Sequence, residues 1–347
     1  MRVYSEVSIF EEVALYPSKY PNWSVILNKH AEVCLNITQA DLDAQLVEGE
    51  LLFEYVKAAE GKEPVALKDY FDAVYANPEE MLVNSRDAFL LKHDKTTAAG
   101  LSTAYGLVVQ SEQDLDDGVL VAPAMFRELL KDKVFDSEGK TGWHLLLDFD
   151  RPPANAMVVI DPYLLTSANG LSNLTRLCDA ILPTSLQVPF QVSIIASHIT
   201  GSGANTVTRL ESWRIPEAGR VIAAVKALRS YVIEVEVVFE KSTEYHKRRV
   251  VLNYANLVCD RGFAVFKDPR GTTVGEVNDA SFRRAFHDIT AIGDTQYAVA
   301  TSWLRGVKRR SGILAAHITN KTAVDPGSIM GDCNTNKTLR NRLINDV

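Results

Sequence analysis

The sequence has few cysteines and no long apolar run. Its four cysteines are widely separated and form no C-x-x-C pair; they are Cys34, Cys178, Cys259 and Cys333. Such spacing argues against a disulfide framework or a zinc ribbon and is typical of a reducing compartment. No stretch of about 18 consecutive apolar residues occurs, so we expect no membrane span. We therefore expect a cytoplasmic protein that holds no metal or cofactor.

The first residues also lack the apolar core of a signal peptide. Hydrophobic residues make up 46% of the chain and charged residues 23%, which is typical of a globular protein. At 347 residues, the chain is long enough for two domains of ordinary size.

Charge is distributed unevenly over a net value of −7. Residues 1–60 carry ten acids against four Lys or Arg, whereas residues 241–270 carry seven Lys or Arg against three acids. A further basic cluster without any acid consists of Arg305, Lys308, Arg309 and Arg310. Local basic patches on an acidic chain indicate a local anionic ligand. The alternative is a basic face that is merely solvated.

The N-terminal part, residues 1–135, has helical patterns and no motif of known function. Helices are predicted after a capping Thr38, over 64–76, over 78–92 and over 122–130. Turn-forming residues at 136–140 and a breaker at 151–153 then indicate a domain boundary. We therefore expect a helix-rich N-terminal domain that ends near residue 135 and binds a protein partner.

The following segment alternates between strands and helices. Strands are predicted at 143–147, 156–161, 190–196, 231–239 and 246–254, and helices at 171–182 and 217–230. This order predicts an α/β sheet with helices packed on its faces. We expect the second domain to cover residues 143–315, with a polar tail over 316–347.

The strand predicted at 246–254 carries the most informative motif. It places His246, Arg248 and Asn253 at a His-x-Arg-x4-Asn spacing. This motif is similar to the His-x-Lys-x4-Asp of the phospholipase D superfamily, with the second and third residue types changed. The order of elements over about 143–310 also resembles that fold, from the strand entering Asp161 to a glycine turn at 260–263. The resemblance implies one phospholipase D-like α/β/α sandwich domain with a degenerate site.

In that family, a histidine attacks phosphorus, a cation stabilises the phosphoryl oxygens and a second histidine protonates the leaving oxygen. Arg248 can bind phosphate in a bidentate way, and Asn253 is expected to orient His246. Strand alternation puts Asn253 on the face opposite His246 and Arg248, unless the strand ends or bulges before it. With one copy of the motif, catalysis needs a symmetric dimer that brings two His246 residues together.

Other residues could extend a phosphate-binding surface. His198 follows a predicted strand at the carboxyl end, where α/β sheets bind ligands. Lys247 and Arg249 flank Arg248, although alternation directs them to the other side of the strand. Trp303 beside the cluster at 305–310 suits a nucleic-acid backbone with a base to stack. A buried Trp beside a solvated basic turn is the alternative.

We therefore expect a degenerate module that binds a phosphate-bearing ligand, in the first place a nucleic-acid backbone. The resemblance also suggests a bacterial defence system as the context. One alternative is an enzyme, namely a homodimeric, metal-independent nuclease or phosphodiesterase that uses His246 of each subunit. The other is a module that binds a phosphoinositide head group or a membrane surface.

Overall fold

The structure is a computed structural model. It describes residues 1–59, 62–121, 125–127, 142–147, 151–166, 169–197, 199–200, 207–208, 211–240, 248–259, 262–264, 266, 280–287, 289, 294–320, 328–331 and 339–347. The chain forms two compact units. Unit 1 comprises Met1–Ala122 and Ala285–Thr295, and unit 2 comprises Pro123–Arg284 and Gln296–Val347.

Unit 1 contains a parallel five-stranded sheet in the order β3-β2-β1-β4-β5. Parallel neighbours need long crossovers, which helices provide here. The strands are β1 (Arg2–Ser5), β2 (Glu32–Leu35), β3 (Val65–Ala66), β4 (Ala88–Leu91) and β5 (Val109–Ser111). The α-helices are α1 (Val7–Leu15), α2 (Pro21–Val25), α3 (Gln39–Gln45), α4 (Leu51–Ala58), α5 (Lys68–Ala76), α6 (Pro78–Leu82) and α7 (Lys95–Tyr105).

One of these helix boundaries was expected from the sequence, and the structure corrects one other expectation. Helix α3 begins after Thr38, whose side chain accepts the Asp41 N–H at 3.2 Å, as expected for an N-cap. The helix predicted over 78–92 is wrong in its second half. Its four fully buried residues Ala88–Leu91 form the central strand β4, because a sheet covered on both faces favours continuous apolar strands. The N-terminal part is therefore itself α/β.

Unit 2 is built on an eight-stranded sheet in the order β15-β11-β8-β7-β12-β13-β14-β6. Strands β7, β8 and β11 are parallel, and the other pairings are antiparallel. The strands are β6 (Met125–Arg127), β7 (Ala156–Ile160), β8 (Phe190–Ser197), β11 (Ile233–Glu240), β12 (Arg249–Leu252), β13 (Ala255–Cys259), β14 (Ala280–Arg284) and β15 (Ser328–Gly331). A separate pair is formed by β9 (Ile199–Thr200) and β10 (Val207–Thr208).

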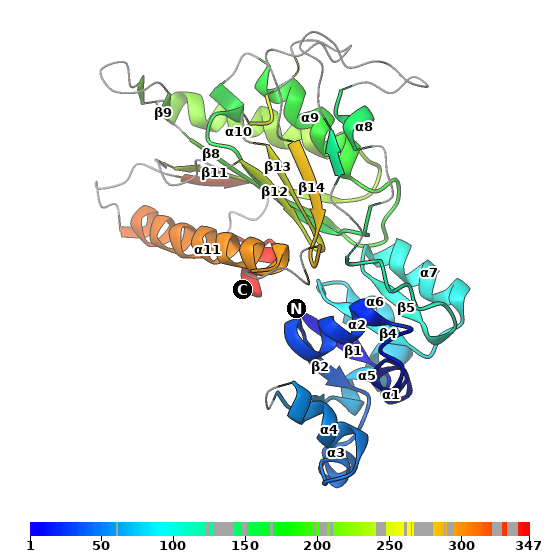
Figure 1. The fold of residues 1–347 in the computed structure, drawn as a ribbon. Coiled ribbons are helices and arrows are strands. Elements are labelled where there is room, and N and C mark those ends of the chain that lie inside the picture. The colour runs from blue at the N-terminus through cyan, green and yellow to red at the C-terminus, as the bar shows by residue number, and fades with distance from the viewer. Residues whose placement is uncertain are drawn as a thin grey trace. The chain divides into compact units, whose positions relative to one another are not determined.

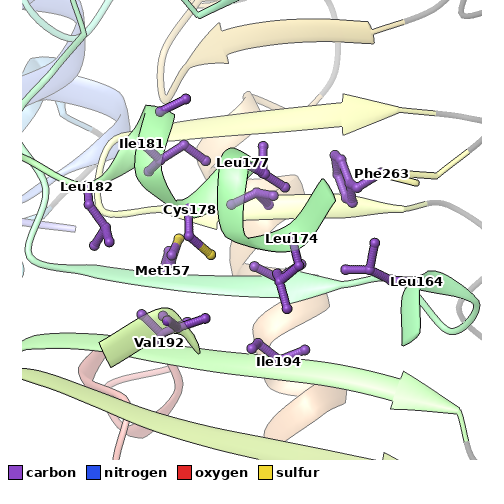
Figure 2. Packing of buried hydrophobic residues seen from close by; sticks show 14 of the residues in the cluster. Met157, Leu164, Leu174, Leu177, Cys178, Ile181, Leu182, Val192, Ile194 and Phe263 are labelled. Carbon is purple, nitrogen blue, oxygen red and sulfur yellow. The ribbon is translucent and has the colours of Figure 1, made fainter. Parts of the chain in front are cut away.

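Helices cover both faces of this sheet (Figure 1). Helices α8 (Trp143–Leu146), α9 (Gly170–Ile181) and α10 (Glu211–Lys226) lie on one face, over what we call the α9-side core. Figure 2 shows Leu174, Leu177 and Cys178 of α9 packed on the strands. Helices α11 (Gln296–Asn320) and α12 (Arg342–Asn345) cover the other face, over the α11-side core. The expected α/β class is confirmed.

Two local expectations in this unit are wrong. Residues 143–146 form helix α8, which packs on α9, because Trp143 is buried between Phe263 and Phe266. Of the helix predicted at 122–130, the described residues 125–127 form strand β6, paired with β14. The two compact units divide after residue 122, whereas the sequence indicated a boundary within 136–156.

The expected polar tail also takes part in the fold. Of residues 316–347, those at 328–331 pair with β11 as strand β15. Leu339, Leu343 and Ile344 are buried in the α11-side core. Within the described residues, no helix has the length and apolar character needed to cross a membrane.

Candidate anion-binding site

Arg248 lies at the edge of the unit 2 sheet where strand β7 ends. It directly precedes β12, and its carbonyl accepts the Cys259 N–H at 3.2 Å, which extends the ladder to β13. The register pairs Arg249 with Ile160, so Arg248 is level with Asp161. The Arg248 guanidinium lies 5.2 Å from the ring centroid of Tyr163, within the range of a cation–π contact. The residue is half-buried.

Asp161 joins two loops beside this cation. Its side chain is 2% exposed; Oδ1 accepts the Tyr163 N–H at 3.0 Å and Oδ2 accepts the Phe263 N–H at 2.8 Å. Burial raises the pKa of Asp161, while these hydrogen bonds and the nearby Arg248 act in the opposite direction. The carboxyl group therefore connects the backbone of Tyr163 to that of Phe263, 100 residues further along the chain.

Gly262, from the turn predicted at 260–263, lies against the same carboxyl group. Gly262 has a φ of +88°, and a Cβ at this position would lie 2.8 Å from Asp161 Oδ2. A side chain would be both strained and in collision there. The turn is held further by the Gly262 N–H, which donates to the Cys259 carbonyl at 3.0 Å.

Asn253 lies at the other end of β12, away from Arg248. Its Oδ1 accepts the N–H groups of Asn155 and Ala156, each at 3.1 Å, and its Nδ2 donates to Asn155 Oδ1 at 2.9 Å. Five residues of extended chain separate Asn253 from Arg248, which is about 16 Å. The structure therefore does not bring these two motif residues together, and Asn253 connects the start of β7 to the end of β12.

The described cations that were expected to extend the phosphate-binding surface lie on the α11 side of the sheet. Arg249 is buried, with its guanidinium 4.6 Å from the ring centroid of Trp303 in α11. Lys308 donates to the carbonyls of Asn345 and Val347 at 2.8 and 2.9 Å. The α11 residues Arg305 and Arg309 are exposed, and Arg310 is half-buried. Arg249 and the α11 cations therefore do not form one surface with Arg248, which contacts Tyr163.

His246, Lys247 and His198 lie outside the described residues. The described residues next to His198 show where strand β8 ends relative to β7. Ser197, the last residue of β8, donates its N–H to the Pro162 carbonyl at 3.0 Å. The carboxyl ends of β7 and β8 thus meet at one edge of the sheet, beside Arg248. Among the described residues, no group of three or more His, Cys, Asp or Glu side chains is suited to hold a metal ion.

Unit 1 contains a polar cluster that the sequence did not reveal. At the ends of β1 and β2, Asn36 Nδ2 donates to the buried Glu6 at 3.0 Å, and Tyr75 Oη donates to the same carboxylate at 2.7 Å. A cavity of about 500 Å³ opens at the ends of β4 and β5. It is lined by Glu12, Lys92, His93, Asp94, Glu112 and Gln113. The sequence analysis missed this cavity because it assigned residues 78–92 to a helix and so did not predict strand β4, at whose end the cavity lies.

No protein-family model matches the sequence, and no curated protein matches it at a significant level.

Proposed function

We propose that unit 2 binds a phosphate-bearing ligand, in the first place a nucleic-acid backbone, through Arg248. The observation that carries this proposal is the position of the Arg248 guanidinium, over Tyr163 and beside the buried Asp161. Arginine suits phosphate because its planar guanidinium donates two parallel hydrogen bonds to one phosphate group.

Two further features support this proposal. Arg248 lies where the parallel strands β7 and β8 end, and α/β sheets commonly bind ligands at that edge. The His-x-Arg spacing from His246 to Arg248 is the part of the motif that resembles the phospholipase D superfamily. The side chain of Asn253 makes its hydrogen bonds at the other end of β12, and the α11 cations belong to the helix on the other face of the sheet. The proposed site is therefore smaller than the sequence suggested.

The test is the affinity of the full chain for a labelled single-stranded oligonucleotide, measured by fluorescence anisotropy. We expect Arg248→Ala to weaken binding by about 10- to 150-fold, since a charge-assisted hydrogen bond contributes roughly 1.5–3 kcal/mol. Arg248→Lys should restore only part of the affinity, because an ammonium group keeps the charge without the paired donors. The matched control is Arg305→Ala, which removes an exposed cation from α11 and should have little effect.

Equal affinity of the wild type and Arg248→Ala, with unchanged thermal melting, would overturn the proposal. Cleavage of the oligonucleotide in the presence of a chelator, abolished by His246→Ala, would support the dimeric nuclease in its place. Binding only to vesicles that contain a phosphoinositide, and not to any oligonucleotide, would support the membrane-surface alternative.

A further inference from the structure

Tyr163 is a large aromatic residue that the fold holds open to solvent beside Arg248. It is 43% exposed, whereas its neighbours on both sides are buried. The 3₁₀ turn that follows, Leu164–Thr166, buries Leu164 and Leu165 in the α9-side core. Figure 2 shows Leu164 beside Leu174 of α9. A single exposed aromatic residue is ordinary by itself, so the surrounding contacts decide what it means.

Those contacts fix the backbone of Tyr163 from several directions. Its N–H donates to Asp161 Oδ1 at 3.0 Å, and the preceding Pro162 carbonyl accepts the Ser197 N–H at 3.0 Å. After Tyr163, the Leu164 carbonyl packs closely against Gly170. A Cβ atom at position 170 would lie 1.7 Å from the Leu164 carbonyl oxygen. The exposed ring is therefore attached to a fixed turn, and ordering it on binding would cost little entropy.

The position of Arg248 adds a second chemical function to this ring. Its guanidinium lies 5.2 Å from the ring centroid. An exposed aromatic ring on a fixed turn, together with an arginine, is a combination that binds a nucleotide in an unpaired strand, because the base stacks on the ring while the cation contacts the phosphate. A duplex keeps its bases stacked inside, so the ring has no base face to contact there.

We propose that Tyr163 stacks on a nucleobase and makes the Arg248 site selective for single-stranded nucleic acid. This inference rests on the proposed function, since it assumes that Arg248 binds the phosphate. It adds the class of ligand and a specificity-determining residue outside the His-x-Arg motif. A free phosphate or an inositol phosphate offers no aromatic base and would gain nothing from the ring.

The experiment compares three labelled probes of equal length: an oligo(dT) strand, an abasic strand with the same phosphates, and a duplex. The wild type should bind oligo(dT) about 5- to 150-fold more tightly than the abasic strand, which corresponds to roughly 1–3 kcal/mol for one stacked base. Tyr163→Ser should lose this preference and keep its affinity for the abasic strand. Tyr163→Phe should keep the preference, because the ring is retained.

The outcomes separate this inference from the proposed function. If Arg248→Ala weakens binding of both single strands and Tyr163→Ser leaves the preference for bases intact, only the stacking role of Tyr163 is wrong. If the duplex binds as tightly as oligo(dT), the selectivity is also wrong. If Arg248→Ala changes nothing, the proposed function itself fails. Retained abasic affinity in Tyr163→Ser also verifies that Arg248 keeps its position without the ring.

Discussion

At the scale of single residues, Asp161 and Glu236 are buried carboxyl groups of unit 2 that have different surroundings. Asp161 accepts two backbone N–H groups beside Arg248. Glu236 of β11 is 2% exposed; it accepts a hydrogen bond from Ser193 Oγ, and its Oε2 accepts the Arg340 N–H at 3.3 Å. Burial raises the pKa of Glu236 from 4.5 to about 7. The protonation of this residue is therefore coupled to folding at mildly acidic pH.

We predict that Glu236 makes unit 2 less stable as pH rises. Below pH 4.5 the group is protonated in both states, and between pH 4.5 and about 7 the folded state holds a proton that the unfolded state has lost. The free energy of unfolding should therefore fall over this window, by on the order of 3 kcal/mol from this group. Urea unfolding at about pH 5 and about pH 8 measures the difference.

Glu236→Gln should remove this part of the pH dependence, because an amide does not titrate. The matched control is Glu234→Gln, two residues away on the same strand, where Glu234 accepts a hydrogen bond from Gln191 at 2.9 Å. That variant should keep the pH dependence, since Glu236 remains buried. A slope that is equal in the wild type and Glu236→Gln would contradict the assignment.

At the scale of elements, the side chain of Asn253 connects the end of β12 to the start of β7. We therefore expect Asn253 to contribute to stability, whereas Arg248 is the residue proposed to bind the ligand. Asn253→Ala would leave two backbone N–H groups, those of Asn155 and Ala156, without their buried acceptor. We predict a loss of about 2–5 kcal/mol in unfolding free energy, with unchanged oligonucleotide affinity at temperatures where the variant is folded. Asn253→Asp keeps an acceptor for both groups and should cost less.

Thermal melting and the anisotropy assay together check this prediction. A fully folded Asn253→Ala protein that binds as weakly as Arg248→Ala would show that Asn253 belongs to the ligand site after all.

Strands with a strong local pattern could be predicted from the sequence, and short edge strands could not. The apolar segments at 156–161, 190–196 and 231–239 form β7, β8 and β11. They could be predicted because each has an apolar pattern that is visible in its own sequence. Strands β6 and β15 have three and four residues, and their pairing depends on partners far along the chain. The Asp161–Phe263 hydrogen bond spans 102 residues, so spacing alone predicted Arg248 but not its surroundings.

At the scale of the whole molecule, the chain enters unit 1 twice. Residues 285–295 follow strand β14 of unit 2 in sequence but belong to unit 1. Phe286 is fully buried there; its N–H donates to the Leu120 carbonyl at 3.0 Å, and its ring stacks on His30 at 5.6 Å between centroids. No sequence pattern predicts a contact between segments so far apart, because neither carries a periodic signal of its own.

We predict that Phe286→Ala destabilises unit 1 by about 3–5 kcal/mol, the usual cost of removing a buried phenylalanine ring. Hydrogen exchange followed by mass spectrometry should then become faster in peptides that cover residues 26–30 and 109–120, while peptides from β8 and β11 stay protected. The matched control is Phe282→Ala, four residues earlier in β14, whose ring is buried in the α9-side core. It should reverse the pattern, because its cavity opens in unit 2. Equal loss of protection in both units for both variants would mean that the units unfold as one, and that the return of residues 285–295 couples their stabilities.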